Sequence, residues 1–381
     1  MNQVAFYLIA HQPRRLRLPA LPLAGLSLTE MVNAVHDDAM NRHYLERISE
    51  LCYRPVLAML QESGWPASVA VTDTLLWQAR KWAPDVAHAF THLPPTIDRV
   101  GVSPRHGFLF CLDLPRYRRA MRRFRGQVTD TTEMWLSQAV AEALSRAGCL
   151  AVLADRSPHL GVRPDGPLIR SLAGLPVILR HRQLSDDVGY RFSDRTAPGW
   201  PMTADRFARR LRQAPQSSGL VGWDMETFGE HHHRDTGILD FLASLPAALE
   251  RAGVQTVRAS ALAQLGPPLS VDGAATWAGT GTPDIFFSSS AQRQVWTFLE
   301  QIWQLAQGRN AKEAALWFTQ SDIFHMLYWA DAAGPLAEVS SYFTPEPWRR
   351  AGPAAFTAEV VAVFRQVRDW FLQMAHTDGA R

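Results

Sequence analysis

The chain of 381 residues is too long for one small domain, and its 3 cysteines are too few for a disulfide-stapled scaffold. Its composition, 47% hydrophobic and 20% charged, is that of a globular protein with a large core. The net charge of +3 is too small to indicate a polyanionic partner, so we expect no nucleic-acid binding.

Short apolar runs alternate with longer helical patterns through the first two thirds of the chain. This alternation predicts an α/β fold with a parallel sheet, and seven strands over about 260 residues favour a barrel. The expected strands are Val4–Ala10, Ser68–Thr72, Ile97–Val102, Cys149–Ala154, Pro176–Leu179, Leu220–Asp224 and Val254–Arg258. The expected helices are Asp38–Glu62, Leu75–His92, Met134–Ala147, Ala204–Arg212 and Ile238–Arg251.

The composition changes after the last expected strand. Residues 266–290 are rich in Gly, Pro, Ser and Thr, which is typical of a linker or a long functional loop. Apolar residues then recur at helical spacing, as in the set Val360, Phe364, Val367, Phe371 and Met374. We therefore expect a catalytic barrel at 1–266, a linker or active-site loop at 267–287, and a helical domain at 288–381.

The segment AFYLIAHQPRRLR places His11 and Gln12 directly after the first expected strand. In barrels, polar residues just past the carboxyl end of a strand lie on the catalytic face. The alternative is that His11 only caps the strand through a hydrogen bond. Position alone does not separate the two interpretations.

The segment GLVGWDMETFGEHHHRDTG brings two carboxylates, Asp224 and Glu226, to the end of another expected strand. Residues two apart in an extended chain face the same side, so both can point into one cleft. With Trp223 as an apolar surface for a ring, they would suit a sugar site. The alternative is an acidic turn before a helix. The run His231–His233 is expected to be a solvated loop, because consecutive histidines rarely converge on one metal ion.

Glu133 lies in GQVTDTTEMWLSQAVAEAL at the start of an expected helix, where the helix dipole favours a carboxylate. The residues alone favour a first-turn acid after a threonine cap. The arginines between Arg118 and Arg125 are expected to form a solvated helix face.

Three further features set the expected environment. No run of about 18 apolar residues is present, so we expect no membrane span, and the N-terminus lacks the features of a signal peptide. Cys52, Cys111 and Cys149 are odd in number and lack metal spacing, which favours a reducing cytoplasm. No metal site and no cofactor are expected.

Taken together, these segments resemble glycoside hydrolase family 57, specifically its α-amylase-like members. The similarity is collinear over nearly the whole chain. The segments that carry it are HQPRRLR (11–17), HDDAMNRHYLERISELCYRP (36–55), TTEMW (131–135), RQLSDDVGYRFSDR with WPMTADRFA (182–208), WDMETFGEHHHRDTG (223–237), QSDIFHMLYW (320–329) and SSYFTPE (340–346).

The resemblance implies an incomplete (β/α)7 barrel followed by an α-helical domain, and a retaining reaction on α-glucosidic bonds. It implies that Glu133 is the nucleophile and Asp224 the general acid/base. The expected substrate-binding residues are His11, Gln12, His106, Trp223, Glu226, Trp277 and Asp322. The expected partner is an α-glucan or maltooligosaccharide; the oligomeric state does not follow from the sequence.

Two segments depart from the family pattern. Where the family's second motif carries a glutamate on a strand, TIDRVGVSPRHGF (96–108) offers only Asp98 and His106. In the fifth motif, TWAGTGTPD keeps Trp277 but has Gly279 in place of the acid, and Asp284 is displaced. These departures predict weak activity, and they support the alternative of a catalytically impaired member that binds glucan or a protein partner. A metal-dependent polysaccharide deacetylase is a third interpretation, but its ligand set is missing.

Overall fold

The computed structural model describes residues 1–332 and 346–378, and the segment SSYFTPE lies almost entirely outside them. The described residues form two compact units, each built from separate stretches of sequence. The first contains Met1–Gln12, Leu45–Ser103 and Leu114–Thr282. The second contains Pro13–Tyr44, Pro104–Asp113 and Pro283–Arg381. The division into 1–266, 267–287 and 288–381 stays a prediction about domains.

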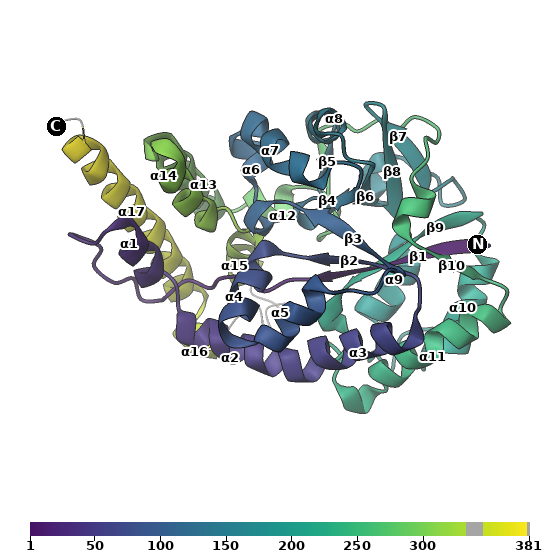
Figure 1. The fold of residues 1–381 in the computed structure, drawn as a ribbon. Helices are drawn as coiled ribbons and strands as arrows, with labels where there is room; N and C mark the ends of the chain where they lie inside the picture. The colour runs from purple at the N-terminus through teal and green to yellow at the C-terminus, as the bar shows by residue number, and fades with distance from the viewer. Residues whose placement is uncertain (333–345, 379–381) are drawn as a thin grey trace. The chain divides into compact units, whose positions relative to one another are not determined.

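The first unit is built around a ring of seven parallel strands (Figure 1). In ring order these strands are β1 (Gln3–Ala10), β2 (Ala67–Val71), β3 (Ile97–Val102), β4 (Val128–Asp130), β6 (Ala151–Asp155), β8 (Leu175–Arg180) and β9 (Ser218–Asp224). β9 pairs with β1 over seven residues, whereas β8 and β9 meet at a single pair, Arg180 with Leu220. The ring is therefore an incomplete (β/α)7 barrel, as expected.

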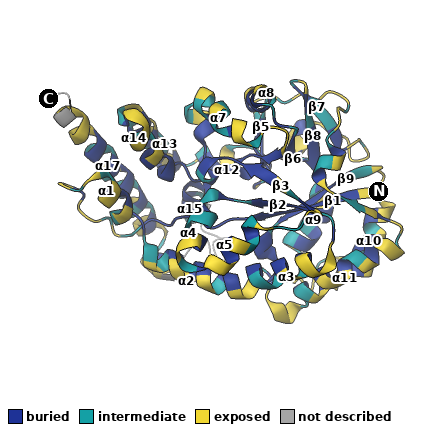
Figure 2. Cartoon of the chain, viewed as in Figure 1, coloured by how far each residue is buried: buried dark blue, intermediate teal, exposed yellow. Residues whose placement is uncertain are grey.

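Successive side chains along each strand point to opposite faces, so they fill both the inside and the outside of the ring. Ala5, Tyr7 and Ile9 of β1 join the core inside the ring, and the strands are coloured as buried in Figure 2. Phe6 faces the other side and packs on Trp65 and Trp223. Because both faces are covered, the strands are almost continuously apolar.

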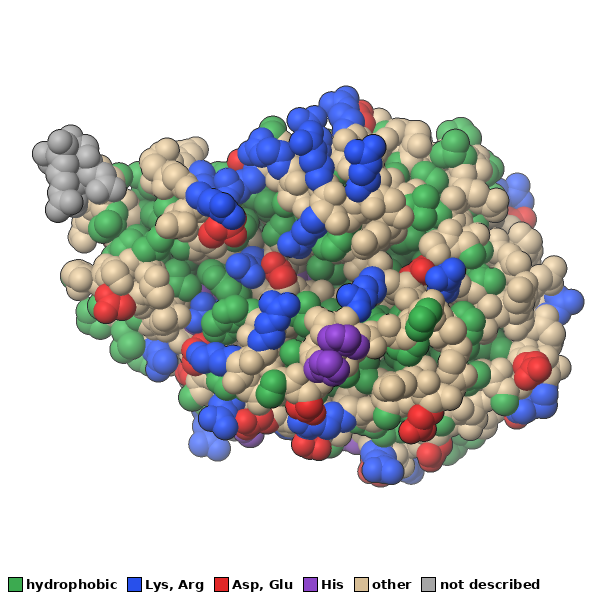
Figure 3. All heavy atoms as spheres, viewed as in Figure 1, with side chains coloured by type: hydrophobic (Ala, Val, Ile, Leu, Met, Phe, Trp, Pro, Cys, Tyr) green, Lys and Arg blue, Asp and Glu red, His purple; other side chains and the backbone are tan. Residues whose placement is uncertain are grey.

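Helices alternate with these strands. They are α2 (Asp38–Ile48), α3 (Arg54–Ser63), α4 (Asp73–Trp82), α5 (Pro84–Thr91), α7 (Leu114–Met121), α8 (Gln138–Ala147), α9 (Arg182–Gly189), α10 (Ala204–Gln213) and α11 (Ile238–Arg251). The expected solvated arginine face is confirmed for Arg119, Arg122 and Arg123, which are exposed. Figure 3 shows basic side chains gathered over α7.

Several expected elements differ in the structure. β4 escaped prediction because only three residues, Val-Thr-Asp, form it. The expected strand Val254–Arg258 is the short β10 (Gln255–Val257), which pairs with β1 beside the ring rather than in it. The expected helix Leu75–His92 is divided at Pro84, because proline lacks the N–H that a continuous helix needs.

The second unit is mainly helical after Pro283. Its helices there are α12 (Asp284–Phe287), α13 (Ser290–Leu305), α14 (Gly308–Ala315), α15 (Ser321–Ala332), α16 (Glu346–Ala351) and α17 (Pro353–Asp378). α13 and α17 pack together. The expected apolar face of α17 is buried at Val360, Phe364, Val367 and Phe371, but Met374 is exposed. Among the described residues, no helix combines the length and the apolar character that crossing a bilayer requires.

Candidate active site

Polar residues gather at the carboxyl ends of the ring strands. Asp130, Asp155, Arg180 and Asp224 are the last residues of β4, β6, β8 and β9. His11, Thr72 and Ser103 directly follow β1, β2 and β3. In a barrel these positions share one face, which is where active sites of this architecture lie. The expectation that His11 lies on this face therefore fits the geometry.

Glu133 lies in a tight turn just after β4. Its φ is 58° and that of Met134 is 49°, so two consecutive non-glycine residues are left-handed. Each such residue costs about 1–3 kcal/mol, and this strain is typical of functional sites. The expected helix beginning at Met134 is wrong: α8 begins at Gln138, and Ser137 caps it. Glu133 is therefore presented by a strained turn rather than by the first turn of a helix.

Trp277 contacts this turn in two ways. Its indole Nε1 donates a hydrogen bond to Glu133 Oε2 over 2.7 Å, and its backbone N–H donates to the Glu133 carbonyl over 3.1 Å. A short antiparallel pair, β5 (Leu136–Ser137) with β11 (Ala274–Ala275), holds the two segments together. Trp277 therefore lies against Glu133 and its indole fixes one carboxylate oxygen, whereas its contact with substrate stays a prediction.

Glu226 has a strongly raised pKa. It is buried, accepts a hydrogen bond from the His11 backbone N–H over 3.0 Å, and accepts another from the Tyr53 hydroxyl. Burial, and then the charge of Asp224, raise the pKa of Glu226 to about 8. This carboxyl group is therefore protonated at neutral pH.

Asp224 is partly exposed and influences several groups around it. Burial, then Asp130 and last the charge of Asp224 raise the pKa of Tyr7, whose hydroxyl donates to Asp130 Oδ2 over 2.5 Å. Tyr190 is largely exposed, and the charges of Asp224 and Glu133 act to raise the pKa of its hydroxyl. Asp224 and Glu133 thus act on one common phenol group.

Two of the expected substrate-binding residues, Trp223 and Gln12, are engaged inside the protein. Trp223 packs against Phe207 and Phe228, and its indole N–H donates to the Ser185 carbonyl. It alternates with Asp224 on β9 and so faces away from the interior, which prevents its ring from contacting a sugar. Gln12 is fully buried and donates to the Tyr53 hydroxyl over 2.9 Å. We assign both to support of the site rather than to contact with substrate.

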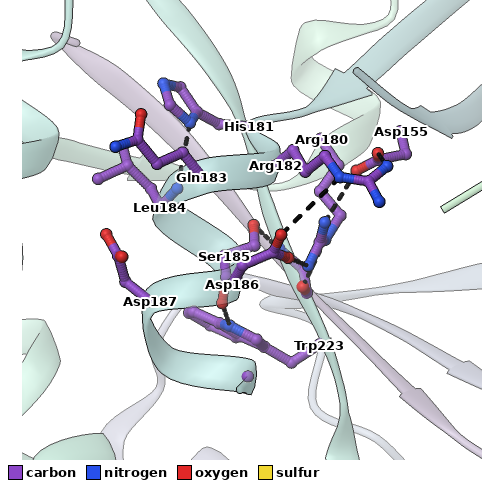
Figure 4. Close-up of polar contacts among 12 residues, drawn as sticks. Asp155, Arg180, His181, Arg182, Gln183, Leu184, Ser185, Asp186, Asp187 and Trp223 are labelled. Carbon is purple, nitrogen blue, oxygen red and sulfur yellow. Dashed lines mark hydrogen bonds and ion pairs between the residues drawn. The ribbon is translucent and has the colours of Figure 1, made fainter. Parts of the chain in front are cut away.

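A buried ionic network lies beside the site. The Arg180 guanidinium binds Asp155 over 2.8 Å and Asp186 over 2.7 Å, while Arg182 binds the other oxygen of Asp155 over 2.7 Å (Figure 4). Burial acts to lower the pKa of Arg180, but the two carboxylates outweigh it and raise that pKa. Arg180 also lies 5.7 Å from the ring centroid of Trp277. The network therefore connects the strand ends to the residue that holds Glu133.

The remaining expected residues have separate surroundings. His106 and Asp322 belong to the second unit, where both are buried, and their contact with substrate stays a prediction. Within the expected solvated run, His232 is instead buried, bound to Ser193 Oγ over 2.7 Å. Among the described residues, no cluster of three or more His, Cys, Asp or Glu side chains is placed to hold a metal ion.

The structure shows where Asp98 and Gly279 lie, the two positions at which the sequence departs from the family pattern. Asp98 lies near the start of β3, where it accepts a hydrogen bond from the Ser260 backbone and pairs with Arg258. It is thus at the opposite end of the ring from the strand-end residues. Gly279 contributes only its carbonyl, which accepts from Arg182 over 2.6 Å. Neither position supplies an acid to the site.

Sequence reasoning missed Tyr53, Tyr190, Asp155 and Arg180. The signal for the last two was present, because each ends a strand on the catalytic face. Tyr53 and Tyr190 follow no comparable rule; they reach the site from helical and loop segments.

Comparisons with known proteins agree with this geometry. A model of glycosyl hydrolase family 57 matches residues 5–96 and 123–271, more than half of the chain. A Methanocaldococcus jannaschii protein described as "Putative alpha-amylase" is 27% identical over an alignment of 266 residues, and the alignment covers 65% of this chain and 56% of that protein. This chain therefore spans little more than half the length of that relative.

Solved structures show the same fold. The 4-α-glucanotransferase of Thermococcus litoralis superposes with a TM-score of 0.56 at 14% identity, covering 93% of this chain and 55% of that one. The exo-type maltose-forming amylase of Pyrococcus sp. ST04 gives 0.54 at 11%, covering 97% and 74%. The α-amylase AmyC of Thermotoga maritima gives 0.52 at 11%, covering 98% and 96%.

Proposed function

Because the chain belongs to glycosyl hydrolase family 57, we propose that it is a retaining glycoside hydrolase or transglycosylase that acts on α-1,4-glucans. The observation that carries the proposal is the strained Glu133 turn, which is held by the Trp277 indole and follows β4, as Asp224 ends β9. Such a turn stores strain to aim one carboxylate, which a structural acid does not need.

In this proposal Glu133 attacks the anomeric carbon as a carboxylate. A bond forms between its oxygen and that carbon while the glycosidic bond breaks, and Asp224 donates its proton to the departing oxygen. Asp224 then takes a proton from water or from a sugar hydroxyl. That oxygen attacks the anomeric carbon and releases Glu133. Water gives hydrolysis and a sugar hydroxyl gives transfer. We expect the two carboxyl groups to lie about 5–7 Å apart.

The neighbours of the pair support these roles. The Trp277 N–H stabilises the charged form of Glu133, which is the form that attacks. We propose that His11 and Glu226 shape the site around the reacting bond, since the His11 backbone is tied to that carboxyl group.

Substrate binding is expected to be weak. The acids of the second and fifth motifs are absent, and hydrogen bonds to charged groups contribute about 1.5–3 kcal/mol each. Losing two lowers kcat/KM on the order of a hundredfold or more, mainly through a high KM.

The decisive experiment is incubation with maltooligosaccharides followed by sizing of the products. Wild type should change the length distribution, and Glu133→Gln should not, because an amide does not displace the leaving group. Asp224→Asn should lose most activity on glucans but keep activity on glycosides with good leaving groups, which need no acid in the first step.

The position of Asp98 and the loss of the acid at Gly279 favour one second candidate, a glucan-binding member with impaired catalysis. If wild type gives no product at high enzyme concentration while Glu133→Gln binds glucan equally well, this candidate replaces the enzyme.

A further inference from the structure

A cavity of about 660 Å³ lies between α9, α10 and the loop that joins them. From α10 it is lined by Arg206, Arg209, Arg210 and Gln213, which recur at i, i+3, i+4 and i+7 and so form one face of the helix. The core-facing residues of α10 are a different set: Ala204, Phe207, Ala208 and Leu211. The cavity therefore opens on the side of α10 that does not serve the core.

The lining is strongly basic. It contains four arginines, Arg191, Arg206, Arg209 and Arg210, and a single acid, Asp187. Asp187 binds Arg191 over 2.8 Å and Arg210 over 2.6 Å, which holds these two guanidinium groups at the wall. The lining keeps an excess of three positive charges.

The other two arginines complete the cavity. Arg206 donates to the carbonyls of Gly199, Trp200 and Pro201, so it fixes the loop against α10. Arg209 is exposed and has no hydrogen-bond or ion-pair partner within the described part of the chain. A guanidinium in a basic cavity without a carboxylate of its own is a suitable donor for an incoming oxyanion.

The cavity is separate from the candidate active site. Figure 4 shows Gln183 and Asp187, which line the cavity, pointing away from the Asp155–Arg180 pair. A ligand in the cavity thus lies on the other side of α9 from the network beside Trp277.

We propose that this cavity binds a phosphorylated small molecule, with Arg209 and Arg210 on the phosphoryl group. A phosphate monoester carries about −1.5 to −2 charges at neutral pH, which suits the excess charge better than one carboxylate does. The volume falls in the range of small-molecule sites, roughly 300–1,000 Å³, and leaves space for the group that carries the phosphate.

The test is calorimetric titration of the full chain, at low ionic strength, with three probes: a hexose 6-phosphate, a nucleoside monophosphate and inorganic phosphate. We expect saturable binding of at least one organic phosphate. Arg209→Glu should weaken it by at least about tenfold, since hydrogen bonds to charged groups contribute about 1.5–3 kcal/mol. This substitution removes no recorded contact among the described residues, so the fold should persist.

The matched control is Arg119→Glu, an equal charge reversal at an exposed arginine of α7 outside the cavity. It should leave the affinity unchanged. Equal weakening by both variants would show diffuse attraction and overturn the proposal. So would the absence of saturable binding, or inorganic phosphate binding as tightly as both organic probes. Tighter binding of the hexose 6-phosphate or of the nucleoside monophosphate would identify the group to which the bound phosphate is attached.

Discussion

At the scale of single residues, the hydrogen bond from Trp277 to Glu133 is the contact on which the proposed chemistry most depends. An N–H that donates to a carboxylate favours the charged form, which is the form that attacks. The bond spans 2.7 Å and Glu133 is buried, so water replaces it poorly.

We predict that Trp277→Phe lowers kcat/KM about 10- to 100-fold, because a charge-assisted hydrogen bond contributes about 1.5–3 kcal/mol. Losing the donor should also raise the pKa of Glu133, so the acidic limb of the pH–rate profile should move to higher pH.

The control is Trp296→Phe. Trp296 also donates its indole N–H to a glutamate, Glu300, over 2.9 Å, but on the exposed surface of α13. Its loss should leave the profile in place. An unshifted acidic limb in Trp277→Phe would contradict the role given to this bond.

Glu226 makes stability depend on pH. Its pKa is about 8 in the folded chain and 4.5 in its ordinary state, so between these values the folded chain binds more protons. The contribution of Glu226 to the free energy of unfolding is therefore complete below about pH 4.5 and decreases as the pH rises towards 8. We predict that Glu226→Gln flattens this decline, because a neutral amide keeps the shape without the cost of ionisation.

Urea unfolding of both proteins at pH 5, 7 and 8.5 measures this effect. Glu142→Gln, on the exposed surface of α8, is the control and should keep the wild-type slope. Parallel stability curves for wild type and Glu226→Gln would show that Glu226 ionises normally.

For single residues, the sequence predicted which side chains carry the proposed chemistry better than it predicted which residues they contact. Glu133 was found only through a family resemblance, because its threonine-flanked motif is also typical of a helix start. Trp223 was misplaced because side chains alternate along a strand, so the residue directly before Asp224 on β9 faces the opposite side from it. Composition alone does not distinguish a tryptophan that is buried in the core from one that stacks against a sugar ring.

At the scale of elements, the strand ends carry the polar network, and the buried Arg180 is its centre. It binds Asp155, Asp186 and the Gly222 carbonyl. Breaking a buried ion pair by removing one partner costs about 3–5 kcal/mol, because a charge remains without compensation.

We predict that Arg180→Met lowers the free energy of unfolding by about that amount, on the order of 3 kcal/mol. The same substitution at Arg163 is the control. Arg163 pairs with Asp165 on the surface, where such pairs contribute about 0–1 kcal/mol. Denaturant unfolding compares the two, and equal losses would show that the network is not a source of stability.

Elements with clear periodicity were predictable, and short ones were not. β1 and α11 match their expected ranges within a residue, since their apolar patterns are long. β4 has three residues and escaped detection, although it delivers Glu133. The expected helix Asp38–Glu62 contains a wider π-helical segment at Ser49–Tyr53, which no simple pattern marks.

At the scale of the whole molecule, the second unit is not formed by the C-terminal part of the sequence alone. It includes Pro13–Tyr44 and Pro104–Asp113, which come from within the first half of the chain. Phe108 contacts Phe286 and Phe324, and the Trp370 indole donates to the Leu26 carbonyl. These early segments therefore need the C-terminal helices as partners.

We predict that ending the chain after Thr282 gives an aggregating product that binds hydrophobic dyes, because those partners are lost. A chain ended after Asp378 keeps them and serves as the control. Soluble yield and dye fluorescence distinguish the two. A soluble, dye-negative truncated barrel would show that the early segments tolerate exposure.

The pairing of β1 with β9 has a consequence for synthesis on the ribosome. β1 leaves the tunnel before its partner β9, which comprises Ser218–Asp224, so the ring stays open until some two hundred further residues are made. At about 5–20 residues per second this interval lasts roughly 10–40 s. Throughout it the nascent chain carries an apolar strand with an unpaired edge, a template for wrong association. Correct folding of the nascent chain therefore depends on whatever covers that edge while translation continues.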